Sequence, residues 1–195
     1  MLPRILCLVS EHDDLSLLAD LAAAGIGGFQ VRAKSLGGRD LTALTGRVAE
    51  AVRPSATVLV NDRLDVALAA GADGVHLGAA DVSVAAARRN APDLLIGATC
   101  RSRAEVEQAA ADGADYAGFG PVFATTSKPG LPEPLGVDAV RAATGVLPLL
   151  AIGGVGPVTA GALIEAGAHG VAVLGAIWRQ PDPCLAAREL VAAVG

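Results

Sequence analysis

Eight short apolar runs recur along the chain, and a stretch with helical periodicity follows most of them. Apolar runs of strand length that alternate with helices predict a parallel sheet buried on both faces. The predicted strands are Ile5–Val9, Gly28–Arg32, Thr57–Val60, Gly74–Leu77, Leu94–Ala98, Tyr116–Gly120, Leu147–Ile152 and Gly170–Leu174. The helical patterns include Leu15–Ala24, Leu41–Val52, Val84–Arg89, Ala104–Ala111, Val158–Ala166 and Cys184–Val194.

A weak internal repeat marks the turns that lead into four of these strands. Its copies are Ala24-Gly25-Ile26-Gly27, Ala70-Gly71-Ala72-Asp73, Asp112-Gly113-Ala114-Asp115 and Ala166-Gly167-Ala168-His169. Glycine suits the left-handed conformation just past a helix end. We therefore expect these segments to be αβ turns at the stability face of a barrel, away from the chemistry.

Eight strand and helix units predict an α/β fold, a compact (β/α)8 TIM barrel that forms a single domain over residues 1–195. Eight units in 195 residues leave about 24 residues for each, which requires short loops. The content of hydrophobic residues, 52%, is enough for a sizeable core. A doubly wound open sheet is the main alternative. The number of units and the lack of an early G-x-G-x-x-G turn favour the barrel.

Charge and hydropathy narrow the classes of partner. The net charge of −5 gives no overall basicity that would indicate nucleic acid. No apolar run approaches the roughly 18 residues that span a membrane, and the N-terminus lacks a signal-peptide pattern, so we expect a cytoplasmic protein. Three scattered cysteines predict reduced thiols rather than a metal site. Both a monomer and a homo-oligomer are compatible with the sequence, since barrels of this kind often pair but nothing in the sequence marks an interface.

Polar side chains gather where the predicted strands end, which is the active face of a parallel barrel. Arg32 and Lys34 follow the second strand and alternate, so they face the same side. Lys34 and Lys128 are the two lysines among 15 basic residues, and both lie at this face. Lysine is a compact charge suited to a phosphate oxygen, so phosphorylated small molecules are the expected substrates.

Two carboxylates lie at the ends of adjacent strands. Asp62 follows the third strand and Asp81 the fourth. A pair of carboxylates together with substrate oxygens suits Mg²⁺. The alternatives are that Asp62 pairs with Arg63 or caps the next helix, and that Asp81 caps the helix near Val84.

Glycines and hydroxyls supply a second group of anion ligands. Gly153-Gly154 and Gly175 follow the last two strands, where backbone N–H groups reach a phosphate in many barrels, although glycine also simply turns a chain. Thr125, Ser127 and Lys128 lie in the longest loop, and such loops often cover substrates. His76 also lies at this face, but it fits a partnered, partly buried residue as well as a functional one, so no histidine base is predicted.

Taken together, these motifs resemble the thiamine phosphate synthase family, with its TenI relatives, over nearly the whole chain. The matching segments are Gln30-x-Arg32-x-Lys34, Asn61-Asp62-Arg63, Gly74-Val75-His76-Leu77-Gly78-x-x-Asp81, Gly120-Pro121-Val122-Phe123-x-Thr125-x-Ser127-Lys128 and Ala151-Ile152-Gly153-Gly154. The resemblance implies a transferase of thiamine biosynthesis. It would join hydroxymethylpyrimidine diphosphate to hydroxyethylthiazole phosphate and give thiamine phosphate and pyrophosphate, through a pyrimidine carbocation.

The resemblance also implies a role for each matching residue. Asp62 and Asp81 would bind Mg²⁺. The catalytic charges would be Arg32, Lys34 and Lys128, which with Asn61 would hold the pyrophosphate. Gln30 and Thr99 would contact the pyrimidine or its diphosphate. Thr125 and Ser127 would hold the thiazole phosphate together with backbone N–H groups of Gly154 and Gly175.

The sequence departs from the family pattern after three strands. Gly78-Ala79-Ala80-Asp81 stands where the family usually has Gly-Gln-x-Asp, Thr99-Cys100-Arg101 where it has Ser-x-His, and Gly175 where a serine is frequent. The TenI-type thiazole tautomerases are the alternative, but that branch tends to carry histidines where this chain has Gln30 and Pro121. A non-catalytic protein that binds thiamine intermediates is the third reading.

Overall fold

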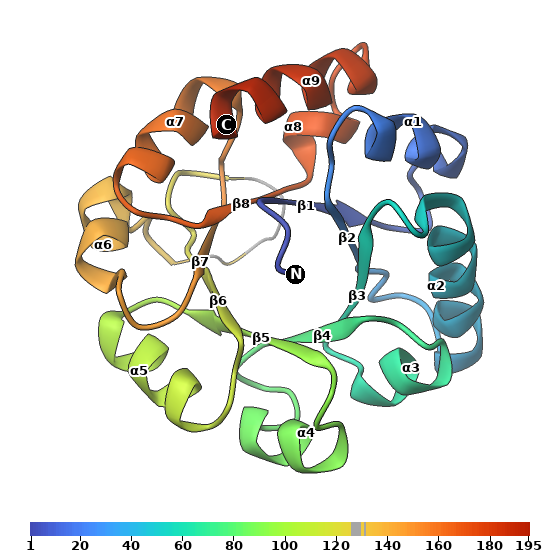
Figure 1. Ribbon diagram of the computed structural model, residues 1–195, viewed down its shortest axis with the longest axis horizontal. Coiled ribbons are helices and arrows are strands. Elements are labelled where there is room, and N and C mark those ends of the chain that lie inside the picture. The colour runs from blue at the N-terminus through green and yellow to red at the C-terminus, as the bar shows by residue number, and fades with distance from the viewer. Residues whose placement is uncertain (126–129, 131) are drawn as a thin grey trace.

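The computed structural model describes residues 1–125, 130 and 132–195, and its eight parallel strands close into one barrel (Figure 1). The strands are β1 (Ile5–Val9), β2 (Gly28–Val31), β3 (Thr57–Asn61), β4 (Gly74–Leu77), β5 (Leu95–Cys100), β6 (Tyr116–Phe119), β7 (Leu149–Ile152) and β8 (Gly170–Val173). Each strand pairs with its neighbours in chain order, and β8 pairs with β1. The predicted barrel is therefore confirmed, and the doubly wound alternative is wrong.

Helices surround the barrel on the outside, as Figure 1 shows. They are the 3-10 turn η1 (Leu15–Leu17), α1 (Leu18–Ala23), α2 (Gly38–Val52), α3 (Leu64–Ala69), α4 (Val84–Asn90), α5 (Arg103–Ala111), α6 (Gly136–Ala143), α7 (Pro157–Glu165), α8 (Gly175–Trp178) and α9 (Pro183–Val194). Among the described residues, no helix combines the length and the apolar character that a membrane crossing needs.

The predicted element boundaries were wrong by one to three residues at several ends, for local reasons. The predicted helix Leu15–Ala24 begins instead as the 3-10 turn η1. Strand β7 starts after Pro148, which has no N–H for the ladder. Strand β5 runs on to Cys100 because β6 pairs with it as far as Phe119. Helices α3 and α8, with six and four residues, are too short to show a periodic pattern.

The repeated glycines lie where the sequence predicts, at the αβ turns. Gly25, Gly71, Gly113 and Gly167 all have φ between 61° and 111°, the left-handed region that favours glycine. Each follows a helix end and precedes a strand. The repeat therefore closes four of the βα units at the end of the barrel opposite the strand C-termini.

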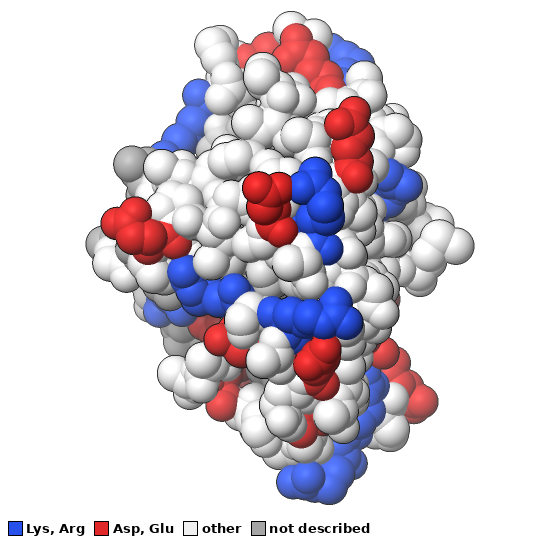
Figure 2. All heavy atoms as spheres, turned by 90° about the vertical axis from the view of Figure 1, so that its left-hand side faces the viewer, with Lys and Arg blue, Asp and Glu red and all other residues white. Residues whose placement is uncertain are grey.

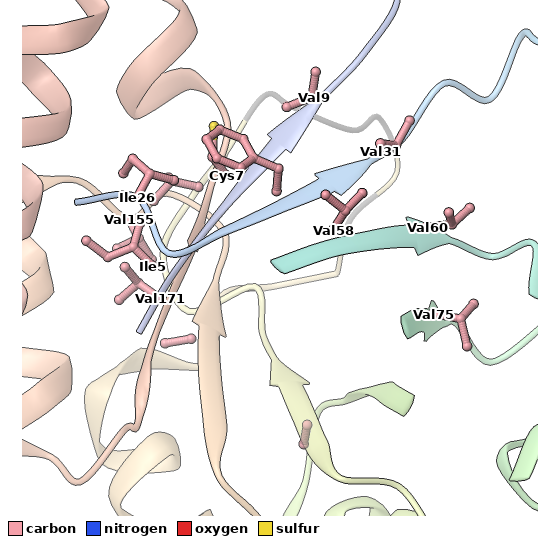
Figure 3. Packing of buried hydrophobic residues seen from close by; sticks show 14 of the residues in the cluster. Ile5, Cys7, Val9, Ile26, Val31, Val58, Val60, Val75, Val155 and Val171 are labelled. Atoms are coloured by element: carbon pink, nitrogen blue, oxygen red, sulfur yellow. The ribbon is translucent and has the colours of Figure 1, made fainter. Parts of the chain in front are cut away.

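The main core fills the space between the strands and the surrounding helices (Figure 3). Val58 and Val60 lie two residues apart on β3 and so share its outer face, as do Cys7 and Val9 on β1. A second, smaller cluster fills the barrel interior with Leu6, Leu59, Tyr116, Leu150 and Ala172. The barrel is thus a packed core rather than a pore.

Charged side chains on the outer surface are mixed in sign. Figure 2 shows basic and acidic residues alternating on the face that lies on the left of Figure 1. Ion pairs on the surface include Arg103 with Glu107 on α5 and Arg141 with Asp138 on α6. Exposed pairs of this kind contribute little stability. The outer face in view therefore presents no broad field of one sign.

Candidate functional site

A cavity of about 1180 Å³ opens at the C-terminal ends of the strands. Ligand pockets for one drug-sized molecule are roughly 300–1,000 Å³, so this cavity has room for more than one small substrate. It is lined by all the predicted site residues that the structure describes: Gln30, Arg32, Lys34, Asn61, Asp62, Asp81, Thr99, Thr125, Gly154 and Gly175. The predicted ligands Ser127 and Lys128 lie outside the described residues.

The loops after β2, β3 and β4 bring one cation and two carboxylates together on one side of the cavity. Lys34 Nζ lies 2.9 Å from Asp62 Oδ2. Asp81 Oδ2 accepts a hydrogen bond of 2.7 Å from the backbone N–H of Gly78. Asp62 and Asp81 are near enough for each to shift the pKa of the other. Asp62 does not pair with Arg63, because Arg63 pairs with Asp65. Asp81 does not cap α4, because the cap of that helix is Ser83.

Asp62 holds a special backbone conformation that places it at this corner. Its φ is 66°, and among the described residues it is the single non-glycine residue with positive φ. Asp and Asn tolerate this region better than other side chains. Its N–H still donates to His76 O at 2.8 Å, so the chain turns immediately after the β3 ladder ends. Such strain is typical of functional sites.

The two carboxyl groups differ in their preferred charge. Burial acts to raise the pKa of Asp62, but the hydrogen bond from Lys34 and the contact with Asp81 outweigh it and hold that pKa below its ordinary value. Burial, together with the neighbouring Asp62, raises the pKa of Asp81. Lys34 and Arg32 both favour the charged form of Asp62, but the charge of Asp62 still disfavours the charged form of Asp81. A cation bound at this corner would relieve the repulsion.

The opposite side of the cavity is built from the backbone of the loops after β7 and β8. Gly153 and Gly154 have φ of 87° and 68°, and Gly175 is the first residue of α8. A Cβ on Gly154 would lie 2.5 Å from the carbonyl oxygen of Ala124. The close approach to the loop after β6 therefore requires glycine. Arg179 also lines this side, and the sequence analysis missed it because it falls beyond the strand end.

A polar network lies deeper, between the two sides. His76 Nδ1 lies 3.0 Å from Tyr116 Oη, and His76 Nε2 lies 3.0 Å from Thr99 Oγ1. Tyr116 is fully buried, His76 is nearly so, and Thr99 is exposed to the cavity. Beside them, Gln30 Nε2 donates to Asn61 Oδ1 at 3.3 Å. Tyr116 could not be singled out from the sequence, because there it looks like any other residue of a buried strand.

Burial of His76 predicts that the fold loses stability between about pH 6.5 and about pH 4. Burial lowers the pKa of His76 to about 4, whereas an unfolded histidine has a pKa of about 6.5. In that window the unfolded chain binds one more proton, so the free energy of unfolding falls as the pH drops. At about 1.4 kcal/mol per pH unit, the loss is on the order of 3 kcal/mol.

Denaturant unfolding across this pH range checks the prediction. Carboxylates also contribute to acid sensitivity, so the comparison is between the unchanged protein and His76→Gln. The variant should show a shallower fall in the free energy of unfolding through the window, whatever its stability at neutral pH. Parallel pH profiles for the two proteins would mean that His76 is not held neutral by the fold.

The residues after β5 show how this chain departs from the family pattern. Arg101, which stands where a histidine is usual, does not line the cavity among the residues that the structure describes. Its guanidinium instead donates to the carbonyl oxygen of Glu133 at 3.1 Å. Ala79 and Ala80 line the cavity beside Asp81, so the position of the usual glutamine is open space at the acidic corner.

A family model, curated relatives and one solved structure all carry thiamine-related names. The family model described as thiamine monophosphate synthase matches residues 3–177. A thiamine-phosphate synthase from Methanoculleus marisnigri is 48% identical over 92% of this chain and 86% of its own length. The bifunctional thiamine biosynthesis protein ThiM/ThiE of Symbiobacterium thermophilum is 47% identical over 94% of this chain, which spans 39% of that longer protein. A solved thiamine phosphate pyrophosphorylase from Pyrococcus furiosus superposes with a TM-score of 0.88 at 30% identity, over 98% of this chain and 95% of that structure.

Proposed function

Since the chain belongs to the thiamine monophosphate synthase family, we propose that its cavity joins hydroxymethylpyrimidine diphosphate to hydroxyethylthiazole phosphate. The products are thiamine phosphate and pyrophosphate, so the enzyme is a transferase of thiamine biosynthesis. We place this activity in the cytoplasm, with small phosphorylated molecules as its partners.

The observation that carries the proposal is that positive charge and backbone N–H groups lie on two sides of one cavity, with leucines and the Tyr116–His76–Thr99 network between them. Arg32 and Lys34 supply positive charge at the ends of β2 to β4. Gly154 and Gly175 supply backbone N–H groups at the ends of β7 and β8. Leu6 and Leu150 lie at the floor. Two phosphorylated substrates fit this cavity, with the phosphate of each bound on one side and their flat rings meeting between the two sides.

The reaction needs charge stabilisation more than proton transfer. The bond from the pyrimidine methylene carbon to the diphosphate oxygen breaks, and pyrophosphate leaves with the electron pair. The thiazole nitrogen then gives its lone pair to that carbon, so no proton has to be removed from either substrate. Arg32, Lys34, Asn61 and Lys128 would stabilise the leaving diphosphate. The leucines at the floor would exclude water, which would otherwise compete for the carbocation.

The acidic corner fits Mg²⁺. Asp62 and Asp81 are neighbouring carboxylates, and Asp62 raises the pKa of Asp81 although Lys34 is beside them. Mg²⁺ commonly binds through one or two carboxylates and substrate phosphate oxygens. In this proposal Asp62 and Asp81 hold the ion, which supplies positive charge to the departing diphosphate when it is bound.

The remaining predicted ligands divide between the two substrates. Gln30 and Thr99 would contact the pyrimidine half. Thr125 and Ser127 would hold the thiazole phosphate together with Gly154 and Gly175. Ser127 and Lys128 enter this proposal from the sequence motif alone.

Product analysis tests the proposed function. Purified protein given both substrates with Mg²⁺ should form thiamine phosphate, detected by mass spectrometry, and should form none when either substrate is left out. Conversion of a thiazole carboxylate phosphate between its tautomers, without thiamine phosphate, would instead assign the protein to the tautomerases. Tight binding of both substrates without any product would make it a carrier of thiamine intermediates.

A further inference from the structure

Three side chains from three strands form a continuous hydrogen-bonded chain from the barrel interior to the cavity. It runs from Tyr116 on β6 through His76 on β4 to Thr99 on β5, with 3.0 Å at each link. Tyr116 has no exposed surface and His76 has little, although both border the cavity, whereas Thr99 is exposed to it. The proposed function gives a role only to Thr99. The two residues behind it need an account of their own.

Two glycines make the space in which the network fits. A Cβ on Gly97 would lie 2.1 Å from Cζ of Tyr116, and a Cβ on Gly118 would lie 2.7 Å from Cε1 of His76. Gly97 pairs with His76 on one side and with Tyr116 on the other, and Gly118 pairs with Thr99. Both rings therefore lie directly against glycine backbone, in space that any larger residue at Gly97 or Gly118 would fill.

The direction of the hydrogen bonds follows from Tyr116. Among the described residues, His76 Nδ1 is the only hydrogen-bond partner of Tyr116 Oη. A buried hydroxyl whose hydrogen finds no acceptor is costly, so Tyr116 donates to Nδ1. The neutral imidazole then carries its hydrogen on Nε2. That hydrogen is donated to Thr99 Oγ1, which leaves the hydroxyl hydrogen of Thr99 free to point into the cavity.

We propose that Tyr116 and His76 are positioning residues that make Thr99 a hydrogen-bond donor toward the substrate. The inference rests on the proposed function and makes it more specific. The substrate atom that faces Thr99 must then be an acceptor, such as a pyrimidine ring nitrogen or a diphosphate oxygen, and not the exocyclic amino group. Because Nδ1 accepts the hydrogen bond from Tyr116, the imidazole carries only the hydrogen on Nε2, so the geometry itself requires the neutral ring.

The tautomer of His76 is the first test, and it needs no substrate. The chain contains three histidines, so His12→Gln and His169→Gln assign the ring ¹⁵N signals to His76 by subtraction. We expect hydrogen on Nε2 and a bare Nδ1 at neutral pH, and a mixture of tautomers in Tyr116→Phe. Hydrogen on Nδ1 in the unchanged protein would overturn the inference.

Kinetics form the second test. Tyr116→Phe and Thr99→Val should each lower kcat/KM for the pyrimidine substrate about 5- to 10-fold, the worth of one hydrogen bond. The thiazole KM should change less than about twofold, and Thr99→Ser should restore most of the loss. Tyr116→Phe should add nothing in a Thr99→Val background, because both changes break the same chain.

Two outcomes separate this inference from a merely structural role. Additive losses in the double variant, or equal losses for both substrates, would mean that Tyr116 only supports the barrel, and would overturn the proposal. If the unchanged protein makes no thiamine phosphate, the proposed function fails, yet the tautomer measurement still decides whether His76 presents Thr99 as a donor.

Discussion

The Asp62→Asn variant is expected to release pyrophosphate about 10²- to 10³-fold more slowly than the unchanged protein, the usual cost of losing one charge-stabilising group. The change removes one negative charge from the corner where Asp62 meets Lys34 and Asp81. Asparagine has the same shape and tolerates the φ of 66° at this position. A loss of activity would therefore reflect the charge rather than the fold.

Asp65→Asn is the matched control for this prediction. Asp65 lies three residues further along the chain, pairs with Arg63 and is largely exposed. It does not line the cavity in the described part of the chain. Its replacement should leave the rate within about twofold, in keeping with the small worth of exposed ion pairs. Equal losses for the two variants, or no loss for Asp62→Asn, would remove Asp62 from the proposed metal site.

Gly154→Ala is expected to have the second large effect. Alanine at a φ of 68° costs about 1–3 kcal/mol, and its Cβ would press on the backbone carbonyl of Ala124 and on Phe123. The loop after β7 must then shift, which moves the N–H groups proposed to hold the thiazole phosphate. We expect the KM for the thiazole substrate to rise about tenfold or more, with a smaller change for the pyrimidine substrate.

Gly156→Ala tests whether this effect is local. Gly156 lies on the same loop with φ of −150°, and an added Cβ there meets nothing within 4 Å. Thermal unfolding of both variants should show a lower Tm for Gly154→Ala alone. An unchanged thiazole KM in a folded Gly154→Ala protein would contradict the placement of that phosphate.

The features that the sequence predicted well are those fixed by local chemistry. Gly25 and Gly71 needed only a helix end before them and a strand after them to be recognised as turns. Arg32, Lys34 and Asp62 line one cavity, as expected, because parallel strands bring all their C-terminal ends to one face. The eightfold repeat of units then made closure into a barrel the natural arrangement.

The features that the sequence did not predict depend on how the strands come together when the barrel closes. Tyr116 and His76 lie 40 residues apart in the chain, and only the register of β4, β5 and β6 brings them together. The sequence also could not decide which basic residue pairs with Asp62, because Arg63 is its direct neighbour in the chain. The turn after β3 instead directs Asp62 toward Lys34 and leaves Arg63 to pair with Asp65.

The most direct test of the central claim is pyrophosphate release by the purified protein with both substrates present, measured with Mg²⁺ and again after chelation. The account predicts release in step with thiamine phosphate formation, and loss of both on removing the metal. Thiamine phosphate formed at an undiminished rate in chelator would contradict the metal role of Asp62 and Asp81. No pyrophosphate from folded protein in Mg²⁺ would contradict the synthase itself.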